Sequence, residues 1–408
     1  MLMANDTRPP VTTTRCTLEI VTDAHRLDML EDDWNALFVT SPTASPPLRF
    51  EWIRQWWRIY GPVYGNAGSG LRVISLRRDG RLIGVLPLYQ SCNGFPLIGA
   101  RQLRFISTGA AEFEETCADY LDLLHAPGES SACLDLLTWA LTKSSQLSWD
   151  QLLLPDMSPA SPLLDLANRL HDGRRRISQY SPGVCHIADL SGGLERYLAD
   201  LSSTTRKKAR KMLRDLQTPD FKFEIATTPS QINLFFDQLV DLHRKRWTAD
   251  GKPGSFAPRH AQFHRELCTR LAPMGQVVIA RLCYHDQPIA LTYGHRVGAK
   301  FDSYQMGVDH KFEAVHSPGA ALYLGLLSHL WQDGVVMCDQ LVGANRFKTD
   351  YAKQQRPLMT LKISQPGFRL AAAAVADLTR RSAIKIGRLI AGESTDAITP
   401  PQAPQPNA

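Results

Sequence analysis

The segment His316-Ser-Pro-Gly319 has the composition of a ligand-binding helix start. It follows a stretch that ends near Asp309, and it opens a run of apolar residues of helical length. A glycine after proline in the first helical turn leaves backbone N–H groups unobstructed, and the positive end of the helix dipole attracts anions. The segment predicts a site for pyrophosphate or a carboxylate. The alternative is an ordinary helix start, because proline is common at that position.

Six cations crowd the stretch from Arg206 to Arg214, and a sparse apolar side comes from Leu201, Ala209, Leu213 and Leu216. This spacing predicts a helix with a basic face. Such a face attracts an anionic partner, such as a phosphorylated or nucleotide-linked ligand, an acidic glycan, nucleic acid or lipid headgroups. Nucleic acid fits least, since no recognised binding motif accompanies the patch. A solvated face without a ligand is the alternative.

The elements that would position these residues occur twice along the chain. The first copy has a hairpin turn at Asp79-Gly80, a helix start at His125-Ala-Pro-Gly128 and a strand containing Asp150-Gln151. The second has a turn at His285-Asp286, the helix start at His316 and a strand containing Asp339-Gln340. After the Asp-Gln step the two copies diverge, as expected if one kept the chemistry and the other became a wall of the cleft.

The length of 408 residues and a hydrophobic content of 44% are sufficient for two domains. We expect an α/β (α+β) fold of tandem duplicated modules, each a mixed β-sheet flanked by helices. The predicted divisions are a disordered arm at 1–16, an N-terminal module at 17–190, a C-terminal module at 191–365, a basic Ala-rich helix at 366–391 and a disordered tail at 392–408.

Several other features bound the class of protein. The eight cysteines include no Cys-x-x-Cys pair, which favours reduced core side chains. No signal peptide or membrane span is visible, so we expect a cytoplasmic protein, with peripheral contact at the inner membrane as a variant. Trp52, Trp56 and Trp57 read as core residues. His260 and His264 read as surface residues rather than metal ligands, so no metal is expected.

The second module resembles the GNAT superfamily of acyltransferases, and within it the double-GNAT branch of FemAB-type peptidyltransferases and CelD-like proteins of bacterial polysaccharide operons. The family's (Gln/Arg)-x-x-Gly-x-(Gly/Ala) loop is similar to His316 through Ala321, with histidine at the first position. The resemblance covers roughly residues 19–365. It implies that His316, Ser317, Gly319 and Ala320 hold the pyrophosphate of an acyl-CoA donor such as acetyl-CoA.

The most specific similarity runs from Asp339 through Gly343 to Phe347-Lys348. It resembles the family's strand ending in Asp, followed by Gly and an aromatic-Lys pair. The resemblance implies that Lys348 lies near the reacting carbonyl, where an ammonium offsets developing negative charge. A surface lysine without a catalytic role is the alternative.

The remaining assignments concern the acceptor. Arg246-Trp247 resembles a family helix ending in Arg-Trp, so Arg246, Trp247, Arg206 and Phe347 are the candidate substrate-binding residues. An attacking amine or hydroxyl needs a base, for which Asp309 and Asp339 are the available carboxylates. Tyr304 is the candidate donor of a proton to the leaving group.

The leading hypothesis is an acyltransferase with its donor in the second module and an anionic or saccharide-linked acceptor, acting in bacterial exopolysaccharide biosynthesis. One alternative is a non-catalytic scaffold of a polysaccharide-assembly system. Another is a FemAB-type transferase that uses aminoacyl-tRNA. The long coiled-coil arm of FemA-type proteins is not visible in the sequence, which favours the CelD-like branch.

Overall fold

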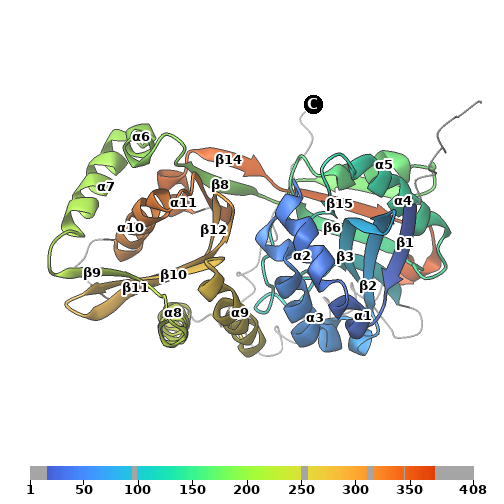
Figure 1. Cartoon of the computed structure of the whole chain (residues 1–408), viewed down its shortest axis with the longest axis horizontal. Helices are drawn as coiled ribbons and strands as arrows, with labels where there is room; N and C mark the ends of the chain where they lie inside the picture. Colours follow the sequence, from blue (N-terminus) through green and yellow to red (C-terminus); the bar gives the residue numbers. More distant parts are fainter. Residues whose placement is uncertain are drawn as a thin grey trace, which may run out of the picture.

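The computed structural model of the chain describes residues 16–93, 99–249, 256–309, 312, 317–343 and 345–372, with the backbone alone at 93 and 246–249. Residues 1–15 of the predicted N-terminal arm, the C-terminal tail and most of the basic Ala-rich helix lie outside these residues, while Cys16, the last residue of the predicted arm, begins the first strand. Two α/β halves lie side by side along the longest axis of the molecule (Figure 1).

The first half is built on an eight-stranded mixed sheet. In spatial order its strands are β1 (Cys16–Val21), β2 (Leu71–Arg78), β3 (Arg81–Asn93), β4 (Ala100–Phe105), β6 (Gln151–Met157), β15 (Met359–Ser364) and β7 (Arg176–Tyr180), and β5 (Leu124–His125) pairs with β3.

The second half is built on a seven-stranded mixed sheet. In spatial order its strands are β9 (Phe221–Ile225), β10 (Val277–Tyr284), β11 (Gln287–Val297), β12 (Lys300–Val308), β13 (Met337–Val342), β8 (Val184–Asp189) and β14 (Gln354–Pro357).

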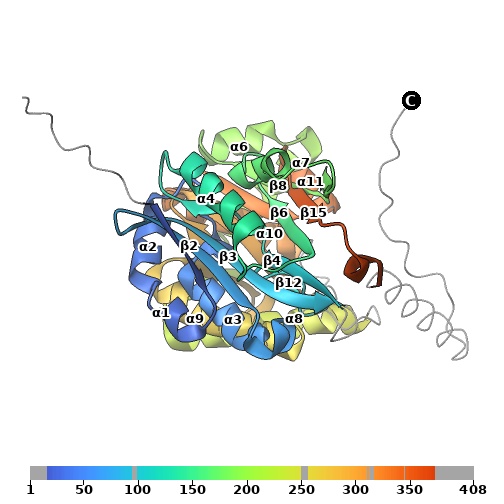
Figure 2. The same cartoon turned by 90° about the vertical axis from the view of Figure 1, so that its right-hand side faces the viewer.

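Helices cover both sheets. The first module has α1 (Ala24–Asp28), α2 (Glu31–Thr40), α3 (Phe50–Tyr64), α4 (Ser130–Lys143) and α5 (Leu166–Arg169). The second has α6 (Leu194–Asp200), α7 (Ser203–Asp215), α8 (Pro229–Ala249), α9 (Pro258–Leu271), α10 (Pro318–Gln332) and α11 (Arg346–Tyr351). In Figure 1, α8 and α10 lie on opposite faces of β10–β12, and in Figure 2 α4 lies across β2 and β3.

Both predicted hairpins are confirmed. The turn residues Asp79 and Gly80 have φ of 49° and 83°, and His285 and Asp286 have φ of 45° and 61°. Two positive φ values match the right-handed twist of the strands that a two-residue turn joins. The turns therefore fix the register of β2 with β3 and of β10 with β11.

The two sheets share one topology, which confirms tandem α/β modules. In each sheet four antiparallel strands, β1–β4 and β9–β12, are followed by a parallel neighbour, β4 with β6 and β12 with β13. The parallel crossovers contain α4 and α10; α10 begins at Pro318, whereas Pro127-Gly128 forms a turn just before α4 begins at Ser130. The sequence repeat is therefore a repeat of the crossover and its hairpin.

Each module, with the boundaries predicted from the sequence, contributes a strand to the sheet of the other. β8 precedes the predicted boundary after residue 190 but pairs with β13 of the second sheet. β15 comes from the end of the second module but lies between β6 and β7 of the first sheet. Hydrogen bonds along these ladders join the two modules directly.

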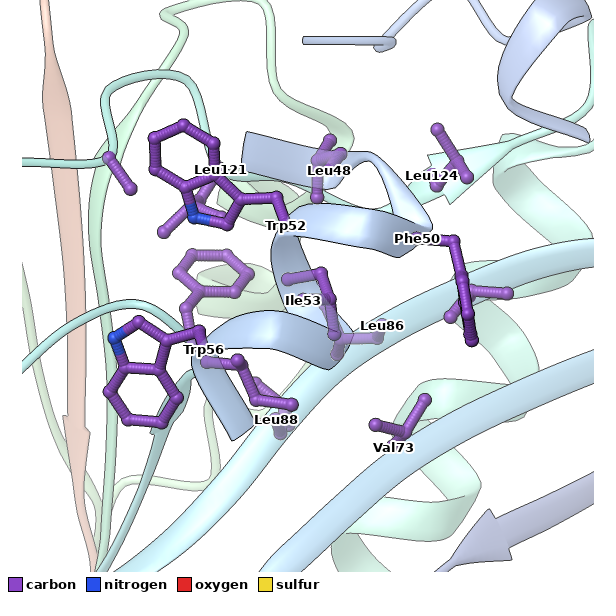
Figure 3. Packing of buried hydrophobic residues seen from close by; sticks show 14 of the residues in the cluster. Leu48, Phe50, Trp52, Ile53, Trp56, Val73, Leu86, Leu88, Leu121 and Leu124 are labelled. Carbon is purple, nitrogen blue, oxygen red and sulfur yellow. The ribbon is translucent and has the colours of Figure 1, made fainter. Parts of the chain in front are cut away.

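The cores of the two modules are continuous. Trp52 and Trp56 are buried among Leu48, Ile53 and Leu88 in the first module (Figure 3). The same apolar cluster extends into α8 and α9 of the second module. A second cluster fills the space between the second sheet and α6, α7 and α10. The tryptophans are core residues, as predicted.

The segment that carries the predicted basic face, around Arg206 to Arg214, is preceded by a separate helix: α6 ends before α7 begins. Leu201 is extended between α6 and α7, and the Ser202 hydroxyl accepts a hydrogen bond from the Thr205 N–H. Serine at this N-cap position satisfies a backbone N–H in the first turn of α7, which otherwise has no partner within the helix. It therefore favours the start of a new helix over the continuation of α6. The six cations from Arg206 to Arg214 all lie on α7.

Candidate active site between the modules

The site is organised by the parting of two parallel strands. β12 and β13 pair only from Lys300 with Met337 to Asp302 with Asp339. Both strands then continue, to Val308 and Val342, without pairing with each other. The backbone groups of β13 beyond Asp339 therefore need other partners.

A segment of the first module, Thr116–Tyr120, provides contacts on both sides of this opening. Asp119 Oδ2 accepts a hydrogen bond from Val342 N at 2.6 Å, on the β13 side. The Thr116 carbonyl accepts one from the Tyr304 hydroxyl, on the β12 side. Cys117 and Tyr120 have φ of 42° and 66°, a left-handed backbone that costs energy in non-glycine residues. The surrounding contacts must hold this segment in place.

Tyr304 is the extra residue of a β-bulge. Tyr293 pairs with Gln305 and Gly294 pairs with Ser303, so Tyr304 has no counterpart on β11. A bulge re-aims a side chain, and here the hydroxyl also lies 3.0 Å from His264 Nε2. Burial raises the pKa of Tyr304 well above its ordinary value, so the phenol stays protonated.

Asp339 is buried and connects the two modules. Its Oδ2 accepts a hydrogen bond from the Tyr120 hydroxyl at 2.7 Å, and its Oδ1 accepts one from Leu341 N at 2.8 Å. Lys300 Nζ lies 3.6 Å from Asp339 Oδ2 and 2.9 Å from Asp302 Oδ1. In this conformation Asp339 is an anchor, and its role as a base stays a prediction.

Lys348 closes the end of β13. Its ammonium donates to the carbonyls of Leu341 and Val342 at 3.0 and 2.7 Å, which leaves one of three protons for another acceptor. Gly343 has φ of 125°, and a Cβ there would lie 3.3 Å from Lys348 Nζ. The spacing between Gly343 and Lys348 in the sequence therefore reflects the close approach of the Lys348 ammonium to the backbone at Gly343. Burial lowers the pKa of Lys348, and the Asp119 carboxylate opposes this shift.

Three carboxyl groups of the first module accompany Lys348. Burial raises the pKa of Glu115 and of Asp119 to about 7, and that of Asp156 to about 6. All three lie near Cys117, whose thiol pKa rises to about 12 through desolvation and their charges, while Lys348 lowers it. Carboxylates that titrate near neutral pH are suited to general-base chemistry.

Asp156 is the most available of these carboxyl groups. It lies near the end of β6 with φ of 57°, it is half-buried, and burial is the cause of its raised pKa. Asp119 is buried and already accepts the Val342 N–H. Sequence reasoning missed both residues, because nothing in a linear pattern brings the first module's strand end to Lys348. The one sequence feature that could have pointed to Asp156 is its position after Pro155, where the two copies of the repeat diverge.

The predicted donor-binding residues lie at the start of α10. Ser317 has φ of 57°, and its carbonyl accepts hydrogen bonds from the N–H groups of Ala320 and Ala321. A Cβ on Gly319 would lie 3.0 Å from Val308 Cγ2, so this glycine lets α10 pack on β12. His316 lies outside the described residues. The start of α10 thus adjoins the strand that borders the opening.

The other site residues predicted from the sequence lie in different parts of the second module. Asp309 follows β12, and its N–H donates to the Ile289 carbonyl at 2.9 Å. The guanidinium of Arg206, on α7, donates a hydrogen bond to the carbonyl of Ala199, on α6. Phe347 packs against the rings of Tyr323 and Tyr351.

Arg246 and Trp247 lie near the end of α8, where the structure describes the backbone alone. The structure therefore joins Lys348, Asp339 and Tyr304 through one first-module segment. Among the described residues, no hydrogen bond or ion pair joins this group to Arg206.

His260 and His264 were predicted to lie at the surface, which is wrong. Both are buried, at 1% and 0% exposure, because α9 packs between α8 and α3. Burial lowers the pKa of His260 to about 3 and that of His264 well below its ordinary value. Across the described ranges, no three His, Cys, Asp or Glu residues are arranged to hold a metal ion.

In the part of the chain that the structure describes, none of the helices combines the length and apolar character that a membrane span requires.

Comparison with known proteins finds a domain match and similar folds. Residues 203–349 match the model of the acetyltransferase (GNAT) domain. The crystal structure of FemX is similar over 85% of this chain and 96% of its own, with a TM-score of 0.57 and 11% identity.

A conserved protein of unknown function from Bacteroides thetaiotaomicron VPI-5482 is similar over 86% of this chain and 100% of its own, with a TM-score of 0.53 and 12% identity. No curated protein sequence matches the chain. At these identities the similar structures establish the fold, and the CelD-like branch stays a prediction.

Proposed function

We propose that this protein, which carries a GNAT acetyltransferase domain at residues 203–349, transfers an acyl group from acyl-CoA to an anionic or saccharide-linked acceptor. The acetyltransferase domain makes the chain an acyltransferase. The identities of donor and acceptor are the proposal. One observation carries it: β12 and β13 part beside the start of α10, and Lys348 lies at the end of the parted strand.

The residues around the opening fit an acyl-CoA donor. Ser317, Gly319 and Ala320 at the start of the 15-residue helix α10 would hold the anionic pyrophosphate. The edge of β12 beyond Asp302 does not pair with β13, so it offers backbone groups to an amide-containing arm. When bound, acyl-CoA supplies a thioester, an acyl group already activated for transfer.

Lys348 is suited to stabilise negative charge. Two of its protons are held by the carbonyls of Leu341 and Val342, which fix the ammonium in direction. A positioned donor in a partly desolvated site stabilises a developing oxyanion by roughly 3 to 4 kcal/mol. The close approach at Gly343 explains why the position of this ammonium depends on the preceding loop.

The reaction balances with one proton acceptor. The acceptor's nitrogen or oxygen bonds to the thioester carbon, the carbon–sulfur bond breaks, and the electron pair leaves with the sulfur. The acceptor's proton moves to a carboxylate, for which Asp156 is the best placed by exposure and pKa. Tyr304, kept protonated by burial, and solvent are the proton sources for the leaving thiolate. Asp309 and Asp339 remain the alternative bases.

The release of free CoA from acetyl-CoA tests the proposal. Acidic or phosphorylated hexosamines and their neutral counterparts are added as acceptors, and the rate is compared with that of hydrolysis alone. We expect an acidic or phosphorylated acceptor to raise the rate.

A donor of the aminoacyl-tRNA type or a non-catalytic scaffold predicts no CoA release with any acceptor. That result, together with absent binding of acetyl-CoA, would contradict the proposal. A role in exopolysaccharide biosynthesis is part of the same proposal, and it depends on an acidic saccharide being the acceptor.

A further inference from the structure

A hollow of about 450 Å3 opens on the first sheet, away from the candidate active site. It lies where β15 runs between β6 and β7. Its polar lining comes mainly from these three strands and consists of Gln151, Arg174, Arg176, Ser178, Lys362, Ser364 and Gln365. The volume is within the range of small-molecule sites.

Strand register brings these side chains to one face. Lys362 of β15 pairs with Ser178 of β7, and Ser364 pairs with Arg176. Side chains two residues apart on a strand point to the same face, and paired residues point to that face together. The two cations and two hydroxyls therefore form a compact set on neighbouring strands.

A row of hydrogen bonds orients the Ser364 hydroxyl. Gln102 Nε2 donates to Gln151 Oε1, and Gln151 Nε2 donates to Ser364 Oγ at 3.0 Å. Because this oxygen accepts from Gln151, its own proton is left to donate elsewhere. The hydroxyl adds a donor beside the two cations.

The lining of the hollow carries positive charge. Its lining contains no aspartate or glutamate. Among the described residues, the side chains of Arg174, Arg176 and Lys362 form no ion pair. The nearby Asp150 is held by Arg101 through two hydrogen bonds of 3.0 Å. A concave set of donors with net positive charge attracts an anion.

The residues after β15 form an apolar wall. Pro366, Leu370 and Ala371 line the hollow, and Phe368 beside them is 70% exposed. Figure 2 shows this short helical segment, in dark red, at the edge of the molecule. Cations next to an apolar wall suit a phosphate group that carries an organic substituent.

We propose that this hollow binds a phosphate-bearing ligand through Arg176, Lys362 and Ser364. Guanidinium groups match phosphate oxygens through paired hydrogen bonds, and the lysine adds a point charge. Gln151 and Asp156 lie at opposite ends of β6, about 16 Å apart along the strand. The hollow is therefore a second site, and it does not depend on the proposed acyl transfer.

Chemical labelling of Lys362 in the full chain tests the site. An amine-reactive acetylating reagent is applied with and without inorganic pyrophosphate, and the modified lysines are quantified by mass spectrometry. We expect pyrophosphate to protect Lys362 and to leave the exposed Lys143 on α4 unchanged. In Arg176→Gln, the pyrophosphate concentration for half-protection should rise at least about tenfold, as expected when a charged phosphate contact is lost.

A matched variant controls for net charge. Arg81→Gln removes an exposed cation from the start of β3, in the same module, and should leave the protection of Lys362 unchanged. Circular dichroism confirms that both variants fold. Protection of Lys348 is measured in the same experiment and reports on the donor site, so the two sites succeed or fail separately.

Two further arms identify the source of the phosphate. Protection of Lys362 by phosphatidylglycerol vesicles, but not by phosphatidylcholine vesicles, supports a lipid headgroup. Protection by pyrophosphate and adenosine diphosphate, but not by vesicles, supports a soluble phosphate ester. Absence of protection by every probe would overturn the proposal, and so would equal protection in Arg176→Gln.

Discussion

The hydroxyl of Tyr120 in the first module donates a hydrogen bond of 2.7 Å to Oδ2 of Asp339 in the second. Asp339 is fully buried, and Lys300 Nζ lies within 4.1 Å of the centre of the Tyr120 ring. The strand end that carries the candidate chemistry is thus held by the neighbouring module. The arrangement of the modules and the geometry of the site depend on each other.

Tyr120→Phe is expected to destabilise the folded chain by about 1.5 to 3 kcal/mol, the range for a hydrogen bond to a charged group. The buried carboxylate would lose a donor that water cannot replace. Urea unfolding measures the change in the free energy of unfolding. Tyr180→Phe, at an exposed tyrosine, is the control and should have little effect. Equal stability of Tyr120→Phe and wild type would mean that this contact does not join the modules.

Lys348→Met is expected to lower kcat and kcat/KM together by about 100-fold, because the ammonium acts on charge that appears in the transition state. Donor affinity should change little. The free energy of unfolding should also fall, by about 1 to 3 kcal/mol, since two carbonyls lose their donor. Rates of CoA release and urea unfolding measure these effects.

Lys353→Met is the matched control for Lys348→Met. Lys353 Nζ also donates to a backbone carbonyl, that of Thr349, but it is exposed. Its loss should leave kcat intact. Lys348→Arg should recover part of the activity, because the charge returns without the compact ammonium. If Lys348→Met turns over as fast as Lys353→Met, then Lys348 has no catalytic role.

Asp156→Asn is expected to lower the pKa of the Cys117 thiol, because a nearby negative charge that disfavours the thiolate is removed. A lower pKa raises the thiolate fraction, so alkylation of Cys117 by iodoacetamide should be faster at fixed pH. Mass spectrometry follows the modification, and the exposed Cys16 on β1 is the internal control. An unchanged Cys117 rate would place Asp156 too far away to act beside Lys348.

The buried His260 side chain is expected to make the free energy of unfolding depend on pH. Burial lowers its pKa to about 3, so between roughly pH 6.5 and 3 the unfolded chain binds a proton that the folded chain does not. Its contribution is therefore full above that window and is lost as pH falls through it. His260→Gln should flatten the fall in unfolding free energy between about pH 7 and pH 5. His171→Gln, at an exposed histidine, should leave the slope unchanged, and an equal slope in both variants would refute this account.

The periodic and local features of the fold could be predicted from the sequence. The two hairpins follow from Asp79-Gly80 and its counterpart His285-Asp286, because turn chemistry is local. The Gly343-to-Lys348 spacing could also be recognised, since it encodes a strand end followed by a capped helix, in which Asn345 Oδ1 accepts the Lys348 N–H at 2.8 Å.

Contacts between distant segments could not be predicted. Asp119 and Tyr120 belong to a loop of the first module and Asp156 to the end of β6, and only the tertiary fold brings these segments to β13. The exchange of β8 and β15 has the same cause, since one strand pattern can pair with either sheet. His260 and His264 were misplaced because an amphipathic helix has two faces, and the sequence does not show that α9 is covered on both sides.

Binding of acetyl-CoA, measured by isothermal titration calorimetry, tests the central claim most directly. We predict one site per chain, lost in Gly319→Val, because a side chain at Gly319 would separate the start of α10 from Val308 of β12. The matched Gly128→Val alters the first module's equivalent turn, where φ is 78°, and should lower stability but keep the site. No binding to the wild-type chain, or equal loss of binding in both variants, would contradict a donor site in the second module.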